Sequence, residues 1–474
     1  MFATENEVVQ TFKNAGQSHV FESYSVLSLE QKKALLAQAS QIDLPFLHSL
    51  ASKFLPVTQP TSHTNAGHIL PPKALRLPQN GGDPSAWNCA RTLGERYLTA
   101  GKIAVLTVAG GHGTRLGITC PKGTFSVTPI KEKSLFQVFA EKIVAAQNKY
   151  DCVIHWFIMT SFANHEDTLE FFNQHNYFRL SPNHIHFFQQ SQMPAIDFEG
   201  KIIMESPASI SMSPDGHGGS FYALKNHKLL DYMAERNIEI ISYHQVDNPL
   251  AKIIDPAFIG FHIEAQSDFS SKMVPKTKPE ERVGLFCIIN GQLQVIEYSD
   301  FPSSLVDQRD PNGRLTFDAA NVAIHLFNRT FVETVTEKQG LLESLPYHRA
   351  IKTIPAFKEV KAISPKEPNG IRFERFIFDA LPLAHNPILI ETERTSEFSP
   401  VKNNTGPDSL ETCLKDQRTL FLSWISHALP DETLATINKI EVSPLFADSK
   451  DDFVKKWAQQ PQIVSPEANE LYIE

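Results

Sequence analysis

The stretch IAVLTVAGGHGTRLGITCPKG, residues 103–123, decides the fold class of the chain. Its first six residues carry no charge and are rich in β-branched side chains, which predicts a strand buried on both faces of a sheet. The residues that follow contain five glycines together with Arg115 and Lys122. Ligand sites in open α/β sheets lie beyond the carboxyl ends of strands. The pattern therefore indicates a sheet strand that ends in a loop for an anionic ligand.

Strand-like and helix-like segments alternate on the carboxyl side of this loop. The segment 134–150 has the apolar spacing of a helix, with Ser134 and Gln137 placed as a capping box. A second strand over 152–159 and a second helix over 165–175 follow, and the alternation continues beyond them. This order predicts an α/β fold of the Rossmann type with a mixed, mainly parallel central sheet.

Composition divides the chain into three parts. Residues 1–100 are expected to form an N-terminal helical segment and linker, since Ser28 begins a second capping box and 55–84 are rich in Pro, Gly and polar residues. Residues 101–386 form the central domain. The weaker alternation after this point predicts a small C-terminal domain over 387–474.

The bulk composition excludes several classes of protein. The chain of 474 residues has a formal net charge of −9, so it offers no general basic surface for nucleic acid. No stretch approaches the apolar length of a membrane span, and the first residues lack a signal-peptide pattern. The five cysteines have no paired spacing, which indicates buried or free thiols in a reducing, cytoplasmic compartment. We expect neither a disulfide framework nor a zinc site.

Three interpretations of the glycine-rich loop compete. A plain turn needs one or two glycines, and this loop has five. The dinucleotide fingerprint G-x-G-x-x-G fails because Leu116 stands at its third glycine, and a P-loop fails because Gly123 follows Lys122. A loop that wraps a nucleoside triphosphate fits best. Glycine backbone can approach phosphates closely, Arg115 can bind two phosphate oxygens, and Lys122 adds a point charge.

The pattern A-G-G-x-G-T-R-L-G-x-x-x-P-K-G, residues 109–123, resembles the nucleotide loop of the eukaryotic-type UDP-sugar pyrophosphorylases. Within this family the resemblance is strongest to the UDP-N-acetylglucosamine pyrophosphorylases. Further blocks agree in the same order, among them SMSPDGHGGSFYAL, VDNPLAKIIDPAFIGF, VIEYSD, FDAANVAIHLF and EFSPVKN. The resemblance covers roughly residues 104–404, whereas the first hundred residues and the tail match weakly.

The resemblance implies a fold and a reaction. The fold would be that of the nucleotide-diphospho-sugar transferases. The reaction would join UTP and a sugar 1-phosphate to give a UDP-sugar and pyrophosphate, with Mg²⁺ as cofactor. Such a transfer needs positioning and charge neutralisation more than a base, because the attacking phosphate oxygen is already ionised. We expect a monomer or weak homo-oligomer with no membrane or nucleic-acid partner.

The resemblance also implies roles for individual residues. Arg115, Lys122 and Lys402 would be the catalytic cations, and Asp247, at the end of an apolar strand, would hold Mg²⁺. Gln190 would read the uracil edge, since an amide offers both a donor and an acceptor. The candidate nucleotide-binding residues are Ala109, Gly110, Gly111, Gly113, Thr114, Gln190 and Gly216.

Two observations on the sugar oppose each other. Glu297, Tyr298 and Asn321 match residues that hold an N-acetylhexosamine in the resembling enzymes. In contrast, His217 stands where the N-acetylglucosamine branch is expected to carry Asn, and a GHG triplet is typical of the UDP-glucose or broad UDP-sugar branches. N-acetylglucosamine 1-phosphate is the predicted substrate, and glucose 1-phosphate is the alternative. The candidate sugar-binding residues are His217, Gly284, Glu297, Tyr298 and Asn321.

Two further positions and a rival function bear on this hypothesis. Arg375 replaces an expected lysine, and it is predicted to contact residues of the site and not the substrates. Cys120 lies two residues before the loop lysine, as a buried thiol or as an exposed thiol that bound UTP would protect. The rival function is a non-catalytic relative that binds nucleotide sugars. The presence of all four charged residues of the proposed site argues against that rival.

Overall fold

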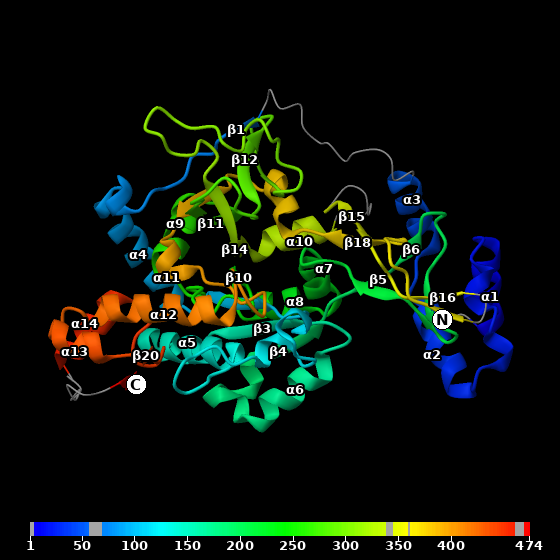
Figure 1. Cartoon of the computed structure of the whole chain (residues 1–474), viewed down its shortest axis with the longest axis horizontal. Helices are drawn as coiled ribbons and strands as arrows, with labels where there is room; N and C mark the ends of the chain where they lie inside the picture. The colour runs from blue at the N-terminus through cyan, green and yellow to red at the C-terminus, as the bar shows by residue number, and fades with distance from the viewer. Residues whose placement is uncertain (1–3, 56–68, 338–344, 359–360, 460–468) are drawn as a thin grey trace. The chain divides into compact units, whose positions relative to one another are not determined.

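The computed structural model describes residues 4–55, 69–337, 345–358, 361–459 and 469–474 (Figure 1). These residues fall into two compact units, each with its own hydrophobic core. The first unit consists of Met1–His63, Gln190–Ala223 and Thr336–Ala380. The second unit consists of Thr64–Gln189, Leu224–Val335 and Leu381–Glu474.

A ten-stranded sheet forms the centre of the second unit. The strand predicted from the quoted stretch is β2, Ile103–Val108, and it is buried apart from a half-buried last residue. It pairs in parallel with β10, Ile240–Gln245, and with β3, His155–Thr160. Strand β3 pairs in parallel with β4, Ile185–Gln189. The carboxyl ends of these strands therefore share one edge of the sheet, and the glycine-rich loop begins there.

Antiparallel strands complete the sheet. Strand β14, Ala319–Asn328, runs antiparallel to β10 and to β11, Phe269–Pro275, so its first residues lie near the carboxyl end of β10. Strand β11 pairs in parallel with β19, Ile388–Glu391. The remaining strands pair antiparallel, namely β1 (Ile69–Leu70), β12 (Leu285–Ile289) and β13 (Gln292–Ile296).

The mixed α/β sheet predicted from the sequence is confirmed. Its share of parallel pairing is smaller than expected, because tight connections such as that between β12 and β13 can join only antiparallel strands. The helices that lie wholly in the sheet region are α4 (Pro84–Thr99), α5 (Leu135–Tyr150), α6 (His165–Gln174), α8 (Leu229–Glu235), α9 (Pro256–Glu264) and α11 (Arg394–Glu397). Two more helices, α7 (Gly219–Asn226) and α10 (Arg329–Glu337), contain residues of both units.

Helix α5 buries the apolar face that its spacing predicts. Phe136, Phe139 and Ile143 are fully buried in the core of the sheet. The predicted capping box at its start is only half formed. The Ser134 side chain accepts a hydrogen bond from Gln137 N, but the Gln137 side chain donates to Glu141 Oε1 at 2.9 Å. The Gln137 side chain therefore bonds the Glu141 carboxylate and does not accept the hydrogen bond from Ser134 N that a complete capping box requires.

The C-terminal segment of the second unit packs around its own apolar cluster, which includes Trp424 and Phe453. It contains α12 (Leu410–Ile425), α13 (Asp431–Thr436), α14 (Lys450–Gln459) and the parallel pair β20 (Lys439–Val442) and β21 (Glu470–Ile473).

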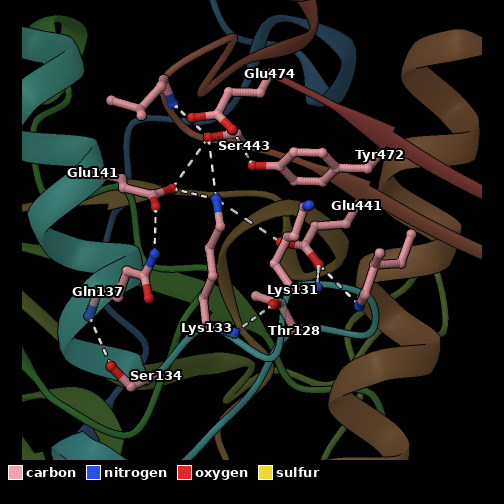
Figure 2. Close-up of polar contacts among 12 residues, drawn as sticks. Thr128, Lys131, Lys133, Ser134, Gln137, Glu141, Glu441, Ser443, Tyr472 and Glu474 are labelled. Atoms are coloured by element: carbon pink, nitrogen blue, oxygen red, sulfur yellow. Dashed lines mark hydrogen bonds and ion pairs between the residues drawn. The ribbon is translucent and has the colours of Figure 1, made fainter.

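A buried lysine joins this segment to the chain that follows the glycine-rich loop (Figure 2). Lys133 Nζ donates to Glu141 Oε2 at 2.7 Å and to Ser443 Oγ at 3.3 Å, and it lies 3.9 Å from Glu441 Oε1. The other oxygen of Glu441 accepts hydrogen bonds from Ile130 N and Lys131 N.

The first unit combines N-terminal helices with short strands. Helices α1 (Glu5–Asn14), α2 (Leu29–Ser40) and α3 (Leu44–Phe54) pack on a small sheet of order β15 (Tyr347–Lys352), β18 (Gly370–Arg375) and β6 (Ile196–Asp197). The capping box predicted at Ser28 is present, with both reciprocal bonds made to Gln31. Short antiparallel pairs join β5 (Gln192–Pro194) to β9 (Met212–Pro214), β7 (Met204–Ser206) to β8 (Ser209–Ile210), and β16 (Ala356–Lys358) to β17 (Lys361–Ile363).

Several sequence predictions concern features outside these cores. Much of the predicted linker over 55–84 lies outside the described residues, and the proposed boundaries at 100 and 386 stay a prediction. Within the described ranges, none of the helices combines the length and apolar character needed to cross a bilayer. All five cysteines are unpaired: Cys287 and Cys413 are buried, whereas Cys120 is exposed, which excludes the buried alternative for this thiol and leaves its protection by UTP a prediction.

Candidate functional site

The glycine-rich loop folds back on itself as a closed hairpin. Lys122 N donates to Gly111 O at 3.2 Å, and Gly113 N donates to Cys120 O at 3.3 Å. The loop therefore brings Lys122 beside its first glycines, although eleven positions separate Lys122 from Gly111 in the sequence. Thr114 and Arg115 lie at the exposed tip of the hairpin.

Open backbone and close packing alternate in this loop. A Cβ atom at Gly111 would meet no atom within 4 Å, so this residue presents bare backbone to solvent. A Cβ atom at Gly113 would lie 2.1 Å from the Ile118 side chain, so glycine is required there by packing. The loop backbone is thus accessible at Gly111 and closed by the Ile118 side chain at Gly113.

A buried asparagine that the sequence analysis missed holds the base of the loop. Asn164 is fully buried, and its Nδ2 donates to Ala109 O at 2.9 Å and to Gly111 O at 3.3 Å. Its Oδ1 accepts from Ser161 N at 2.8 Å. Its place just before α6 suggests only an N-cap, so no sequence signal distinguished this role.

The side chains of Lys122 and Asp247, which were both predicted to belong to the same site, lie next to each other. Lys122 Nζ lies 3.2 Å from Asp247 Oδ2, and the two side chains are only 15% and 13% exposed. Asp247 follows the carboxyl end of β10, and Lys122 comes from the loop that follows the neighbouring β2. The parallel pairing of the two strands therefore explains why residues 125 positions apart meet.

Asp247 offers a carboxylate to a metal ion at this edge of the sheet. Within the described part of the chain, no three His, Cys, Asp or Glu side chains gather closely enough to hold a metal. Mg²⁺ at phosphoryl-transfer sites is usually bound through one or two carboxylates and the substrate phosphates. The Asp247 carboxylate therefore fits an ion that is held partly by a nucleotide, and it does not fit an all-protein cage.

The segment that carries Lys402 is bonded to the same strand end. Val401 N donates to Asp247 O at 2.8 Å. The buried Asn248 side chain bonds this segment twice more, because its Nδ2 donates to Glu397 O at 2.7 Å and its Oδ1 accepts from Ser399 N at 3.1 Å. These three bonds place the backbone of Lys402 close to Asp247.

Helix α12 contacts both lysine-bearing segments through adjacent residues. Ser399 Oγ, near Lys402, donates to Asp416 Oδ2 at 2.6 Å. Gln417 is buried, and its Nε2 donates to Val127 O at 2.7 Å, on the chain that follows Lys122. One helix thus fixes the backbones of both segments, a role that neither Asp416 nor Gln417 reveals in the sequence.

Three of the candidate sugar residues lie together on the antiparallel side of the sheet. Gly284 and Glu297 flank the β12–β13 hairpin, and a Cβ atom at Gly284 would lie 3.1 Å from Glu297 Oε1. Asn321 N, on β14, donates to Gly284 O at 2.9 Å. Tyr298 follows Glu297 and is 50% exposed, so it is not part of the hydrophobic core.

The candidate base-reading residues belong to the first unit. Gln190 is buried, and its Nε2 donates to Gly216 O at 2.6 Å and to Asp215 Oδ1 at 3.1 Å. Gly216 has a φ of +85°, and a Cβ atom there would lie 2.4 Å from Arg375 O. Only glycine therefore fits at position 216.

A buried cation lies behind these residues. Arg375 is 3% exposed and stacks at 4.1 Å on the rings of both Tyr222 and Tyr347. Its guanidinium is 4.0 Å from Asp215, and burial raises the pKa of the Asp215 carboxyl to about 6 in spite of this positive neighbour. Arg375 thus contacts Asp215, which in turn contacts Gln190, in agreement with its predicted supporting position.

His217 is held as a neutral imidazole. Its Nδ1 accepts a hydrogen bond from Ile377 N at 3.2 Å, and its ring stacks on Phe376 at 5.5 Å. Burial lowers the pKa of His217 to about 4, with a smaller effect from His348. The proton of the neutral ring is therefore on Nε2, which is a donor.

The sequence matches known proteins over most of its length. A family model described as UTP–glucose-1-phosphate uridylyltransferase covers residues 73–465. The chain belongs to the UDP-sugar pyrophosphorylase family. Members of this family are nucleotidyltransferases, and UTP and a sugar 1-phosphate are the substrates that membership implies.

Individual UDP-sugar pyrophosphorylases resemble the chain from end to end. The mouse UDP-N-acetylhexosamine pyrophosphorylase-like protein 1 is 35% identical over 90% of this chain and 86% of its own length. The UDP-N-acetylglucosamine pyrophosphorylase of Saccharomyces cerevisiae is 36% identical over 88% of this chain and 91% of its own. A crystal structure of the Trypanosoma brucei UDP-N-acetylglucosamine pyrophosphorylase in complex with an inhibitor has a TM-score of 0.83 at 26% identity, and the match covers 100% of this chain and 98% of that one.

Proposed function

We propose that the protein is a uridylyltransferase that makes UDP-N-acetylglucosamine and pyrophosphate from UTP and N-acetylglucosamine 1-phosphate. The observation that carries this proposal is the meeting of Lys122, Asp247 and the Lys402 segment at the carboxyl edge of the sheet, beside a glycine-rich hairpin. Two cations, one carboxylate and bare backbone amides suit the transfer of a charged phosphoryl group.

In the proposed reaction an oxygen of the sugar phosphate attacks the α-phosphorus of UTP. The bond from this phosphorus to the bridging oxygen breaks, and pyrophosphate leaves. The hairpin amides and Arg115 bind the nucleotide phosphates, and Lys122 neutralises charge at the transferring group. Lys402 orients the attacking phosphate. A Mg²⁺ ion held by Asp247 and the nucleotide would supply further charge neutralisation.

Selection of uracil is assigned to Gln190. Its amide nitrogen is already engaged with Gly216 O and Asp215, so Oε1 is the atom it would present to a base. A carbonyl oxygen accepts from the N3–H of uracil, whereas cytosine has an acceptor at that position. This contact favours UTP over CTP. We expect UTP to be preferred to ATP and GTP as well, because a pocket that satisfies one base edge leaves polar groups unpaired when another base enters.

The sugar assignment rests on the group of Gly284, Glu297 and Asn321. A glutamate can accept from two sugar hydroxyls, and an asparagine can bond an acetamide. Glucose 1-phosphate is the second candidate, and His217 favours it, because its ring is bulkier than the Asn expected in the N-acetylglucosamine branch.

A panel of substrates tests both assignments. Pyrophosphate release is measured with UTP and each of several sugar 1-phosphates, and then with the preferred sugar and each nucleoside triphosphate. The proposal predicts the highest kcat/KM with UTP and N-acetylglucosamine 1-phosphate. Glucose 1-phosphate used at least tenfold better would transfer the assignment to the second candidate. Binding of UDP-sugars without turnover would support the non-catalytic relative.

His217→Asn separates the two sugars further. If the His217 ring fills the space of the acetamide, this substitution shifts preference towards N-acetylglucosamine 1-phosphate. If His217 donates to the sugar in place of the expected Asn, the preference is unchanged.

A further inference from the structure

A basic pocket lies at the edge of the sheet in the second unit, outside the residues assigned to the transfer reaction. Lys276 directly follows β11 and Asp318 directly precedes β14, and Lys276 N donates to Asp318 O at 2.7 Å. The pocket has a volume of about 320 Å³. Its lining includes Arg76, Lys276, Thr277, Arg309, Arg314 and Asp318.

Lys276 contributes a buried positive charge to this pocket. Its side chain is 8% exposed, and no described residue makes a hydrogen bond or an ion pair with its ammonium group. Burial lowers the pKa of Lys276, although Glu281, Glu280 and Asp307 act in the opposite direction. A buried ammonium without a close partner is unfavourable, and a bound anion would remove this penalty.

The two carboxylates that line the pocket, Asp318 and Glu391, share one arginine. The Arg76 guanidinium lies 3.8 Å from Asp318 and 3.9 Å from Glu391. Glu391 also accepts hydrogen bonds from Asn80 Nδ2 at 2.8 Å and from Leu77 N at 3.1 Å. The pocket lining thus carries four cations, Arg76, Lys276, Arg309 and Arg314, against these two carboxylates.

Two arginines add to the positive charge. Arg309 and Arg314 lie on an exposed hairpin that is closed by the bridge from Arg309 to Leu315. The Asp310 carboxylate within this hairpin is engaged by Asn312 N and Arg314 N, both at 2.9 Å. Besides Arg76, which lies near both lining carboxylates, the pocket is therefore lined by three cations, Lys276, Arg309 and Arg314.

We propose that this pocket binds the phosphate group of a small phosphate ester at a site separate from the UTP and sugar 1-phosphate sites. Lys276 supplies the point charge at the floor, and Arg309 and Arg314 supply planar donors that suit phosphate oxygens. A volume of about 320 Å³ exceeds that of one phosphate and falls in the range of roughly 300–1,000 Å³ that small-molecule sites occupy, so it leaves room for an organic part.

The pocket is connected to the candidate sugar-binding residues through the chain segment that carries Asp318 and Asn321. Asp318 is three residues before Asn321 on the same chain segment, and Asn321 bonds Gly284. An occupied pocket is therefore expected to change the KM for the sugar 1-phosphate more than the KM for UTP. The binding itself does not rest on the proposed function, because it is measured without turnover.

Protection of Lys276 from chemical labelling tests the site. The full chain is treated with an amine-acylating reagent, with or without glucose 6-phosphate, and the labelling of each lysine is followed by mass spectrometry. Glucose 6-phosphate should slow the labelling of Lys276 at least threefold. Uncharged glucose should not, and the exposed Lys278 should be unaffected. Equal protection of Lys278, or no protection of Lys276, would overturn the proposal.

Calorimetric binding of the same probe gives an independent measurement. Lys276→Met and Arg314→Gln should each weaken the binding of glucose 6-phosphate at this site at least tenfold, whereas the matched variant Lys278→Met should not change it. Arg314 is on an exposed hairpin, so its variant tests the site even if Lys276→Met does not fold. Unchanged binding in Arg314→Gln and Lys276→Met would overturn the site, and protection by inorganic phosphate alone would overturn the ester.

Discussion

The side chains of Lys122 and Lys402 differ in their exposure and in their pairing with carboxylates. The Lys122 side chain is 15% exposed and already paired with Asp247, whereas the Lys402 side chain is 40% exposed and its nearest carboxylate, Asp408, is 3.9 Å away. The Lys402 backbone is nevertheless fixed by the buried Asn248 and by Asp416 through Ser399. The Lys122 ammonium is thus paired and largely withdrawn from water, whereas the Lys402 ammonium is more exposed on a segment whose backbone is fixed.

The largest effect is expected from Lys122→Met. Loss of a cation that is partly withdrawn from water should lower kcat by about a hundredfold or more, because electrostatic stabilisation is strongest where solvent is excluded. Pyrophosphate release measures kcat, and the thermal unfolding temperature serves as a control for folding. A folded Lys122→Met variant with near-normal turnover would contradict the phosphate-binding role of the loop.

Lys402→Met should have a smaller effect that depends on salt. Its ammonium is more exposed, so its interaction with a phosphate is screened, and a loss of roughly tenfold in kcat/KM for the sugar 1-phosphate is expected. The loss should shrink as ionic strength rises, which steady-state assays at several salt concentrations measure. Lys415→Met, on the exposed face of α12, is the matched control. A loss as large and as salt-independent as that of Lys122→Met would abolish the distinction.

Asn248→Ala should disturb both lysines through the backbone. It leaves Glu397 O and Ser399 N without their buried partner, which should lower the free energy of unfolding by about 1–3 kcal/mol. It should also raise the Mg²⁺ concentration needed for half-maximal activity, because Asp247 adjoins the same bonds. Gln417→Leu, which releases Val127 O instead, should lower stability by a similar amount and leave the Mg²⁺ dependence unchanged. An identical Mg²⁺ dependence in both variants would show that Asn248 is only structural.

The last effect, which concerns stability and not turnover, involves the lysine that bonds the chain just after Asp247. Lys142 donates to Pro249 O and Ala251 O, both at 2.7 Å, and burial lowers its pKa to about 7. Between pH 7 and 10 the unfolded chain therefore binds more protons at Lys142 than the folded chain, and its contribution makes stability rise with pH. The urea-unfolding free energy of the wild type should gain at most about 1.4 kcal/mol per pH unit on that of Lys142→Met. Parallel pH curves for the two proteins would contradict the lowered pKa.

The sequence predicts what depends on local pattern and fails where distant chain segments meet. The charge-free run of β2, the capping box at Ser28 and the apolar face of α5 follow from residues a few positions apart. The resemblance likewise pointed to Lys122 and Asp247, which lie together.

The residues that hold the candidate site were not predicted. Asn164, Asn248 and Gln417 are polar side chains whose partners are backbone atoms elsewhere in the chain, and such a bond leaves no pattern of residue types. Because backbone carbonyls are identical at every position, only the structure can show which one a buried amide contacts.

The contacts that Lys133 makes with Glu441 and Ser443 can form only late in the synthesis of the chain. Ser443 is 310 residues beyond Lys133, and Glu441 adjoins it in β20. At about 5–20 residues per second, a ribosome takes about 15–60 s to cover that distance. Of the three side chains near the Lys133 ammonium, Glu141 is the one synthesised early in this interval. The bonds from Lys133 to the C-terminal segment are therefore made only after most of the polypeptide has emerged, and a chain cut short before β20 would lack this anchor altogether.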